Sequence, residues 1–565
     1  MYVDRSSPIV TSATAASKLP RFALLALLVA FICPGIITRD FWGSSELSTF
    51  ATILTMINGS GIDWALPNTL GLNDYKDAPL LLWLSAFFSK TFGWLLTDEV
   101  ASRLSILFCY TFTTGCIWYG TWYLARREEA QPVALAFGQG ASPRDYGRVV
   151  ADAALLLFIG TIGLFVPLRE LDSDIALIAI TSSFTMSLAW ALWHPKYGAT
   201  LTGCICGLAV LASDLWLGIA LLLLALYVHA RAHAFIPQQR LPRLIAIVVA
   251  ATTVFLLWPL AGVAFSIEKV DAWWAGWWAH QLSLIDLPNQ KDMAWMLKNG
   301  LWFVWPVGPF MLACLYAFRK QIGRTHIKFP LMVLGTLALW ALFVRLPNES
   351  LLMAFIPPAS ILAGFGMMAA RRSWSSVLDW FSACVFSLII LALWVYFISW
   401  HIGYPPKMYY SVYKLAPTVE PVFHGLWLAL CFATTLAWAC LVMWRMDHTK
   451  SIAWRGPWLA AAGVSAVAII TIGLFGNLID GNRSFKPVAE HILADYNAQK
   501  ANSSCIDARA LDNTQIAYLT HWGLPLEKAA CNFKLVQGTT IEQGWDVVGY
   551  YNRPRDRSGF ILLKK

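Results

Sequence analysis

The sequence predicts a polytopic α-helical membrane protein with a small α/β domain at its C-terminus. Hydrophobic residues make up 58% of the 565 residues and charged residues only 13%, and the mean hydropathy is +0.57. Apolar runs of about 20 residues, the length of a membrane-spanning helix, recur along the chain. From about residue 482 the sequence becomes polar and mixed. This pattern excludes an ordinary soluble globular protein.

Thirteen apolar segments are candidate spans. They cover residues 21–38, 101–124, 149–167, 174–193, 198–212, 215–230, 243–266, 300–318, 328–344, 350–370, 376–399, 423–444 and 456–478. We expect the first to be a retained span and no signal peptide, because no small-residue cleavage pattern follows Asp40. The apolar run from Pro79 to Gly93 is short and contains Lys90, so we expect it on the membrane surface or re-entrant.

The basic residues predict the orientation of these spans. With the N-terminus in the cytoplasm, almost every Lys/Arg cluster falls in a cytoplasmic loop, as Arg126-Arg127, Arg319-Lys320 and Arg371-Arg372 do. The net charge of +9 is explained in this way and does not indicate a nucleic-acid partner. An odd number of spans then places the C-terminus outside, on the side where the acidic residues gather.

The tail, residues 482–565, is predicted to be a small exported α/β domain. We expect a helix over Val488–Gln499 and strands at Ala517–Leu519, Phe533–Val536, Val547–Tyr551 and Phe560–Leu563. Two of the 11 cysteines, Cys505 and Cys531, lie in this tail, and export would favour a disulfide between them. No Cys/His spacing resembles a zinc site, so no metal ligand is assigned.

The loop after the first span, residues 39–100, is rich in carboxylates and tryptophans. Its landmarks, in order, are Arg39, Trp42, Glu46, Gly61, Asp63-Trp64, Pro67, Gly71, Pro79-Leu80 and Trp83; further on come Leu171-Asp172-Ser173-Asp174, Trp258-Pro259, Trp273 to His280 and Trp305-Pro306. This order and spacing resemble the GT-C glycosyltransferases, in the branch of the aminoarabinose transferases of lipid A and the protein mannosyltransferases. The resemblance covers nearly the whole chain. It implies a GT-C-like membrane module over residues 1–481, with about thirteen transmembrane helices, and a periplasmic domain over residues 482–565, in a bacterial inner membrane.

Two departures from the family pattern bear on activity. Ser45 stands where the family has the catalytic Asp of an Asp-Glu pair, and Lys76-Asp77 carries the charges of the family's acidic-Lys pair in swapped order. A serine cannot act as a carboxylate base at neutral pH. Either a neighbouring carboxylate has taken that role, or this protein does not catalyse the family reaction.

The reaction that the resemblance implies moves a sugar from a polyprenyl-phosphate donor to a lipid, glycan or protein acceptor. The phosphate leaves as an anion, so it needs positive charge near it more than it needs an acid, and the acceptor needs a carboxylate to take or orient its proton. No cofactor is required, although a divalent metal is compatible with the chemistry. The expected catalytic residues are Asp40 and Glu46, with Lys76, Arg103 and Arg345 at the donor phosphate. Further site candidates are Asp77, Asp172, Asp174 and His280.

Structural interpretations compete with these roles. Glu46 also suits a first-turn helix charge, Asp172 and Asp174 suit N-caps, and the tryptophans from Trp273 to Trp278 suit a belt at the membrane interface. Two other classes of protein stay open. A catalytically silent relative would bind a polyprenyl-linked glycan or lipid as a scaffold or partner subunit, and Ser45 favours it. A transporter is disfavoured, because the sequence shows no evident buried charge pairs in mid-span and no inverted repeat of broken helices.

Overall fold

The computed structural model of the chain describes most of its length. The described residues are 7–9, 11–12, 16–71, 78–133, 140–172, 174–231, 239–286, 290–344, 349–370, 372–447, 454–499, 505–538, 544–554 and 559–565. The predicted site residues Lys76, Asp77 and Arg345 lie outside them.

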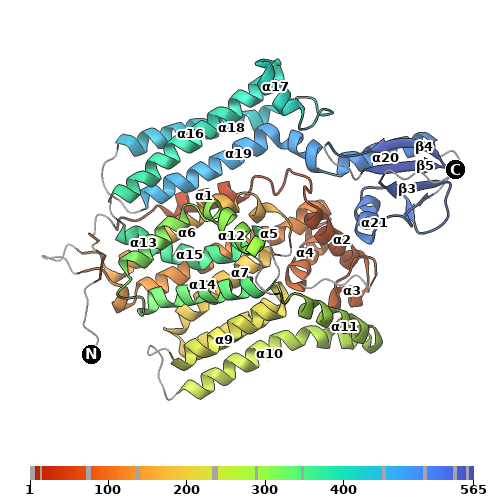
Figure 1. Ribbon diagram of the computed structural model, residues 1–565. Helices are drawn as coiled ribbons and strands as arrows, with labels where there is room; N and C mark the ends of the chain where they lie inside the picture. Colours follow the sequence, from red (N-terminus) through yellow and green to blue (C-terminus); the bar gives the residue numbers. More distant parts are fainter. Residues whose placement is uncertain are drawn as a thin grey trace.

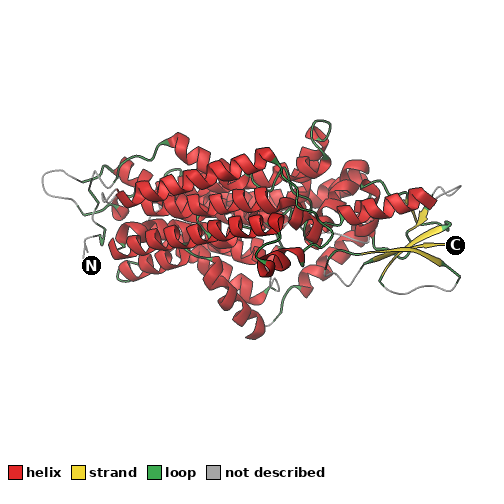
Figure 2. Cartoon of the chain, turned by 90° about the horizontal axis from the view of Figure 1, so that it is seen from above, coloured by secondary structure: helices red, strands yellow, loops and turns green. Residues whose placement is uncertain are grey.

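A bundle of long helices forms the body of the molecule, and a small sheet domain stands at one end of it (Figure 1). The helices before the last long one are α1 Arg21–Ile32, α2 Ser44–Asn58, α3 Gly61–Ala65, α4 Pro79–Phe92, α5 Asp98–Ala125, α6 Pro143–Ile159, α7 Ile175–Ala191, α8 Pro195–Ala212, α9 Leu215–Arg231, α10 Arg240–Phe265, α11 Ile267–Ser283, α12 Gln290–Phe303, α13 Val307–Ala317, α14 Thr325–Phe343, α15 Glu349–Ala369, α16 Arg372–Ile402, α17 Pro406–Tyr413 and α18 Gly425–Asp447. Helix α19, Arg455–Arg483, leads to the sheet domain. We call the end of the bundle that carries this domain, seen again in Figure 2, the outer end.

Each predicted span overlaps a helix, but the helices differ in length. Among the described residues, seven helices are long and apolar enough to cross a membrane, or up to nine if each of two bent pairs counts as one span. The bent pairs join α6 to the 3-10 turns at 162–169 and α12 to α13. Helices α1, α7 and α9 are apolar but shorter. The polytopic fold class is therefore confirmed, while thirteen crossings stay a prediction. Helix α15 is the central element, with 89% of its apolar window buried, whereas α18 has only 11% buried and faces outward.

The first helix ends earlier than the sequence predicted. Helix α1 stops at Ile32, because Pro34 and Gly35 follow, and Gly35 has a φ of +85°, which favours glycine over other residues. The chain then runs without regular structure to Ser44, where α2 begins. This early break directs residues 36–43 across the outer end of the bundle, where the site described below is built.

Two ion pairs join different helices, and in each pair the arginine lies at or near a helix end and not in mid-span. The Arg21 guanidinium lies 2.8 Å from the fully buried Asp152 carboxylate of α6, and Arg445 of α18 pairs with Asp379 of α16. The sequence did not reveal these pairs because the partners are 131 and 66 residues apart. Each pair neutralises a carboxylate that would otherwise be costly inside a bundle.

The C-terminal domain is a five-stranded sheet flanked by helices α20 Lys486–Gln499 and α21 Asn513–His521. The strands are β1 Ile506–Asp507, β2 Leu526–Glu527, β3 Phe533–Gln537, β4 Asp546–Tyr551 and β5 Phe560–Lys564, in the order β2-β1-β3-β5-β4. Strand β1 pairs in parallel with β2 and β3, and β5 pairs antiparallel with β3 and β4. The predicted helix and the last three predicted strands are present.

Residues 517–519 were predicted as a strand but belong to helix α21. A capping box explains the difference: the Asp512 carboxylate accepts from the Gln515 N–H, and the Gln515 side chain accepts from the Asp512 N–H. The helix that begins at this cap includes the short apolar run 517–519. Helix α21 then packs against α2, which attaches the domain to the outer end of the bundle (Figure 1).

A disulfide joins Cys505 and Cys531, with the two Cα atoms 5.7 Å apart. It links the loop before β1 to the loop before β3. Among the described residues, these two cysteines and Glu527 form the one group of potential metal ligands. Because both sulfurs are in the disulfide, only the carboxylate of Glu527 is left there as an ordinary ligand.

Candidate functional site

The site is centred on the N-terminus of α2, where the family position Ser45 meets a second loop. The Ser45 hydroxyl donates a hydrogen bond of 2.6 Å to Oδ2 of Asp172, which lies 127 residues later in the turn before α7. Ser45 is exposed and Asp172 half-buried, so the pair is open to solvent. The structure therefore puts a carboxylate beside the position at which the resembled family carries its catalytic Asp.

Glu46, the next residue, points the other way, into the protein. Its carboxylate accepts from Arg39 Nη1 at 2.8 Å and from Arg39 Nη2 at 2.5 Å, and also from the backbone N–H groups of Trp42 and Leu171. Only 1% of Glu46 is exposed. Burial by itself would raise the pKa of Glu46, but the guanidinium groups of Arg39 and Arg103 outweigh it and lower the pKa below its usual value.

A carboxylate held in this way stays ionised and is out of reach of a substrate. Its contacts instead tie the 36–43 segment to α2 and to the turn before α7. The position of Glu46 thus favours a structural role over the catalytic role expected from sequence, and the physical reason is its complete enclosure by four donors.

Two further arginines donate hydrogen bonds to backbone carbonyl groups. Arg103 of α5 donates from Nη1 to the carbonyl oxygens of Ile36 and Arg39, and its guanidinium stacks 4.3 Å from the Phe41 ring centroid. Arg169 donates from Nε to the Pro34 carbonyl at 3.0 Å. Both side chains are buried. Arg103 was expected at the donor phosphate, but in this structure it supports the segment that follows α1.

Asp40 lies at the edge of this network and is one-quarter exposed. Its backbone N–H donates to Oδ1 of Asp480, at the end of α19, and the Trp42 indole N–H donates to the same oxygen at 2.6 Å. The Lys486 ammonium lies 4.0 Å from the Asp40 carboxylate and 3.7 Å from that of Glu99. Asp40 therefore stands at the junction of the outer loop, the last long helix and the sheet domain.

Sequence reasoning missed two acidic residues of this region. Asp480 anchors the outer loop across 440 residues, and its only sequence signal was an acidic residue at the outer end of the last span. Glu170 is half-buried beside Asp172, and burial together with the negative charge of Glu46 raises its pKa. Its signal was its place next to the Leu171-Asp172 motif. Asp480 thus adds a carboxylate next to Asp40, and Glu170 adds one close to Glu46 and Asp172.

The remaining described candidates have other positions. Asp174 is the residue immediately before α7, and its N–H donates to Oδ1 of Asp172 at 3.2 Å. It thus takes part in the turn that presents Asp172. His280 is half-buried on α11, a helix that packs against α10.

The tryptophans of α11 form a packed cluster, which corrects the expectation of an interfacial belt. Trp273 and Trp277 are each only 1% exposed, and their ring centroids lie 5.3 and 5.7 Å from that of Trp258. Trp274 contacts the same ring at 5.0 Å. Only Trp278, 51% exposed, fits a belt. The rings bury one another because helical spacing puts residues 273, 274 and 277 on the face toward α10.

The architecture that carries this site is the GT-C fold. Two solved structures of ArnT from Cupriavidus metallidurans share it over almost the full length of both proteins. The structure bound to undecaprenyl phosphate has a TM-score of 0.64 and 15% sequence identity, and the apo structure has a TM-score of 0.63 and 17% identity. Each match covers 96% of this chain and 97% of the ArnT chain.

At these identities the likeness establishes the fold and not the reaction. No protein-family model matches the sequence. No curated protein matches it either. What the protein does must therefore be argued from its own residues.

Proposed function

We propose that the protein is a membrane glycosyltransferase that transfers a sugar from a polyprenyl-phosphate donor to an acceptor at the outer end of the bundle. The observation that carries the proposal is the hydrogen bond from Ser45 to Asp172, which supplies a solvent-accessible carboxylate at the family's catalytic position. The fold is compatible with such a donor, because the ArnT structure with the same fold is bound to undecaprenyl phosphate. We place the protein in a bacterial inner membrane with the sheet domain in the periplasm.

In this proposal Asp172 is the base that orients the acceptor and takes its proton. The acceptor oxygen attacks the anomeric carbon of the donor sugar, and the bond from that carbon to the phosphate oxygen breaks. The electron pair leaves with the oxygen, giving a polyprenyl phosphate, while the acceptor proton passes to Asp172. No organic cofactor enters, because the leaving phosphate carries the charge.

Ser45 and Asp40 support this chemistry in different ways. The Ser45 hydroxyl and the Asp174 N–H donate to the two oxygens of Asp172 and so fix the orientation of this carboxylate toward the acceptor. Asp40 is the second candidate base, on the side of the site that faces the sheet domain. Lys76, on the same outer loop, is the proposed contact for the donor phosphate, as its place in the family motif implies.

The test is sugar transfer by the purified full-length protein in lipid nanodiscs. The donors are undecaprenyl-phosphate sugars, the acceptors are envelope lipids, and the readout is mass spectrometry of released undecaprenyl phosphate and of glycosylated lipid. Loss of a general base should lower the rate by roughly 10²–10⁴-fold. We expect Asp172→Asn to show this loss with an unchanged unfolding temperature. Asp271→Asn, the same change at an exposed position on α11, is the matched control.

Full transfer by Asp172→Asn would remove Asp172 from the mechanism, and the same comparison on Asp40→Asn then decides between the two carboxylates. The absence of Asp from position 45 gives one specific reason for a second candidate, the silent binding protein. That protein would bind undecaprenyl phosphate and release no product from any donor, in wild type and in both carboxylate variants.

A further inference from the structure

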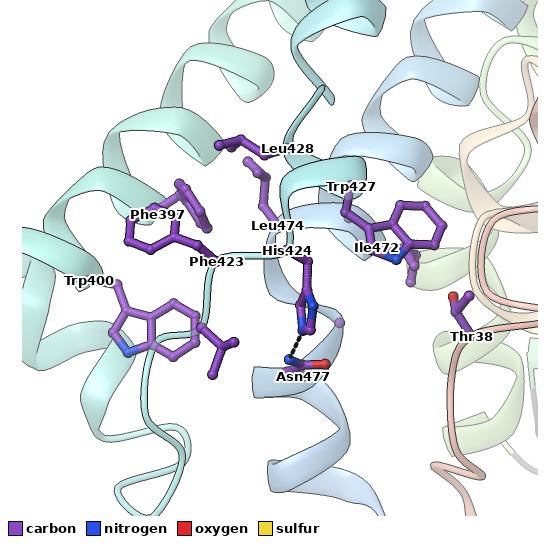
Figure 3. Close-up of a pocket in the computed structure, with 13 residues that line it drawn as sticks. Thr38, Phe397, Trp400, Phe423, His424, Trp427, Leu428, Ile472, Leu474 and Asn477 are labelled. Carbon is purple, nitrogen blue, oxygen red and sulfur yellow. Dashed lines mark hydrogen bonds between the residues drawn. The ribbon is translucent and has the colours of Figure 1, made fainter. Parts of the chain in front are cut away.

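A cavity next to the candidate site has no role in the reaction as described so far. It has a volume of about 210 Å³ and lies between the outer ends of α16, α18 and α19, with Thr38 on the remaining side (Figure 3). Phe397 and Trp400 come from α16, Trp427 from α18, and Asn477 from α19. The cavity is thus built by helices far apart in sequence from the outer loop.

Most residues of the cavity lining are aromatic or aliphatic, but polar and apolar atoms contribute about equally to its accessible wall. The Asn477 side-chain amide lies 3.0 Å from Nε2 of His424, and Figure 3 shows this pair between Trp400 on one side and Trp427 on the other. The Thr38 hydroxyl faces the Trp427 side. Aromatic and aliphatic side chains beside placed polar groups are the usual lining of a small-ligand site.

The cavity and the candidate site share two segments of the chain, the one after α1 and the end of α19. Thr38 immediately precedes Arg39 and Asp40 in the chain. Asn477 lies about one helical turn before Asp480, the residue that accepts from the Asp40 N–H. A molecule in the cavity therefore touches the same chain segment and the same helix that position Asp40.

The position of the cavity indicates a ligand that comes from the membrane. The apolar windows of α16 and α18 are only 28% and 11% buried within the protein, so these two helices leave most of their surface to lipid. The volume lies below the roughly 300–1,000 Å³ of sites for drug-sized ligands, so it suits a single ring. A sugar ring fits the lining, because its C–H faces pack on aromatic rings and its hydroxyl groups bond to an amide, an imidazole or a hydroxyl.

We infer that this cavity binds the saccharide head group of a membrane glycolipid, which is the acceptor of the proposed transfer. The lipid chains lie along the exposed surface of α16 and α18, and the sugar sits between Trp400 and Trp427 within reach of His424 and Asn477. The assignment of this glycolipid as the acceptor rests on the proposed function. Binding of an alkyl glycoside in the cavity can nevertheless be measured without any transfer.

The experiment is photo-cross-linking of the full-length protein in nanodiscs with a decyl glucoside that carries a diazirine on the first carbons of its chain. The matched probe has the same photoreactive chain on a phosphocholine head group. We expect the glucoside to label peptides that contain residues 422–428 or 472–477. Asn477→Leu and Trp427→Ala should each reduce that labelling by roughly tenfold, the effect of losing about one good interaction. Trp380→Ala, at a 57% exposed tryptophan of the same helix pair, should leave it unchanged.

Equal labelling by the phosphocholine probe would overturn the inference, because the cavity would then bind any lipid chain. Displacement of the glucoside by undecaprenyl phosphate would also overturn it, because the cavity would belong to the donor. The unfolding temperature of each variant separates loss of binding from loss of fold, and the displacement experiment uses wild type only. Failure of transfer with retained glucoside labelling would sink the proposed function and leave the sugar site standing.

Discussion

Replacement of Glu46 by glutamine tests whether this residue has a structural and not a catalytic role. The change keeps the shape of the side chain but leaves the buried Arg39 guanidinium, 2% exposed, without its counter-charge. Removing one partner of a buried ion pair costs about 3–5 kcal/mol. We expect Glu46→Gln to lower the free energy of unfolding by roughly that amount, and to lower the yield of folded protein, before any effect on catalysis is considered.

The assay is a thermodynamic cycle on the purified protein in detergent, followed by tryptophan fluorescence during SDS titration. The double variant Arg39→Met/Glu46→Gln has no uncompensated charge, so it should be less destabilised than the sum of the two single variants. Asp172→Asn, which changes an accessible carboxylate, should cost less than about 1 kcal/mol. A stable, well-expressed Glu46→Gln protein that has lost sugar transfer would refute this reasoning and return Glu46 to the list of candidate bases.

Four other outcomes are expected. The pKa of Glu46 is held below its ordinary value of 4.5. Its ionised form therefore contributes fully to stability at neutral pH, and this contribution is lost as the pH falls through the folded-state pKa. Between pH 7 and pH 3 the unfolding temperature should therefore fall more steeply in wild type than in Glu46→Gln. Cys505 and Cys531 should resist maleimide labelling in intact cells until a reductant is added, and two freely labelled thiols would contradict the disulfide. Reduction should destabilise the sheet domain by about 3–4 kcal/mol, the effect of opening a closed loop of 26 residues. Arg103→Lys should lower thermal stability without changing undecaprenyl phosphate binding, because its visible partners are carbonyl groups. Lys76→Ala should weaken undecaprenyl phosphate binding at an unchanged unfolding temperature, and unaltered binding would take Lys76 out of the site.

The exported domain shows where sequence pattern succeeded and where it failed. Strands β3, β4 and β5 alternate or concentrate β-branched and aromatic residues, and the sequence located them. Strands β1 and β2 are two residues long, too short for any periodicity. Residues 517–519 were assigned to a strand because they are apolar, whereas the hydrogen-bonded cap at Asp512 decided for a helix. Short elements thus depend on caps and neighbours more than on composition.

Similar limits apply to the long-range contacts. Asp480 contacts Asp40 and Trp42, the α11 tryptophans pack on Trp258, and Asp152 and Asp379 form ion pairs. All of these contacts join residues from separate segments of the chain. The long apolar helices were predictable because apolar length is a property of the local sequence. Which side chains meet between helices depends on how the helices are rotated and packed, which local sequence does not contain.

By itself the sequence determined the polytopic α-helical class, the change to a polar α/β domain after residue 482, and the outer loop as the place of the candidate chemistry. Only the tertiary structure distinguished Ser45 from Glu46. Neighbouring residues on a helix point about 100° apart, so when one faces outward to Asp172 the next turns inward to Arg39. The sequence shows two adjacent polar residues; the packing of α2 against the bundle decides which of them a substrate can reach.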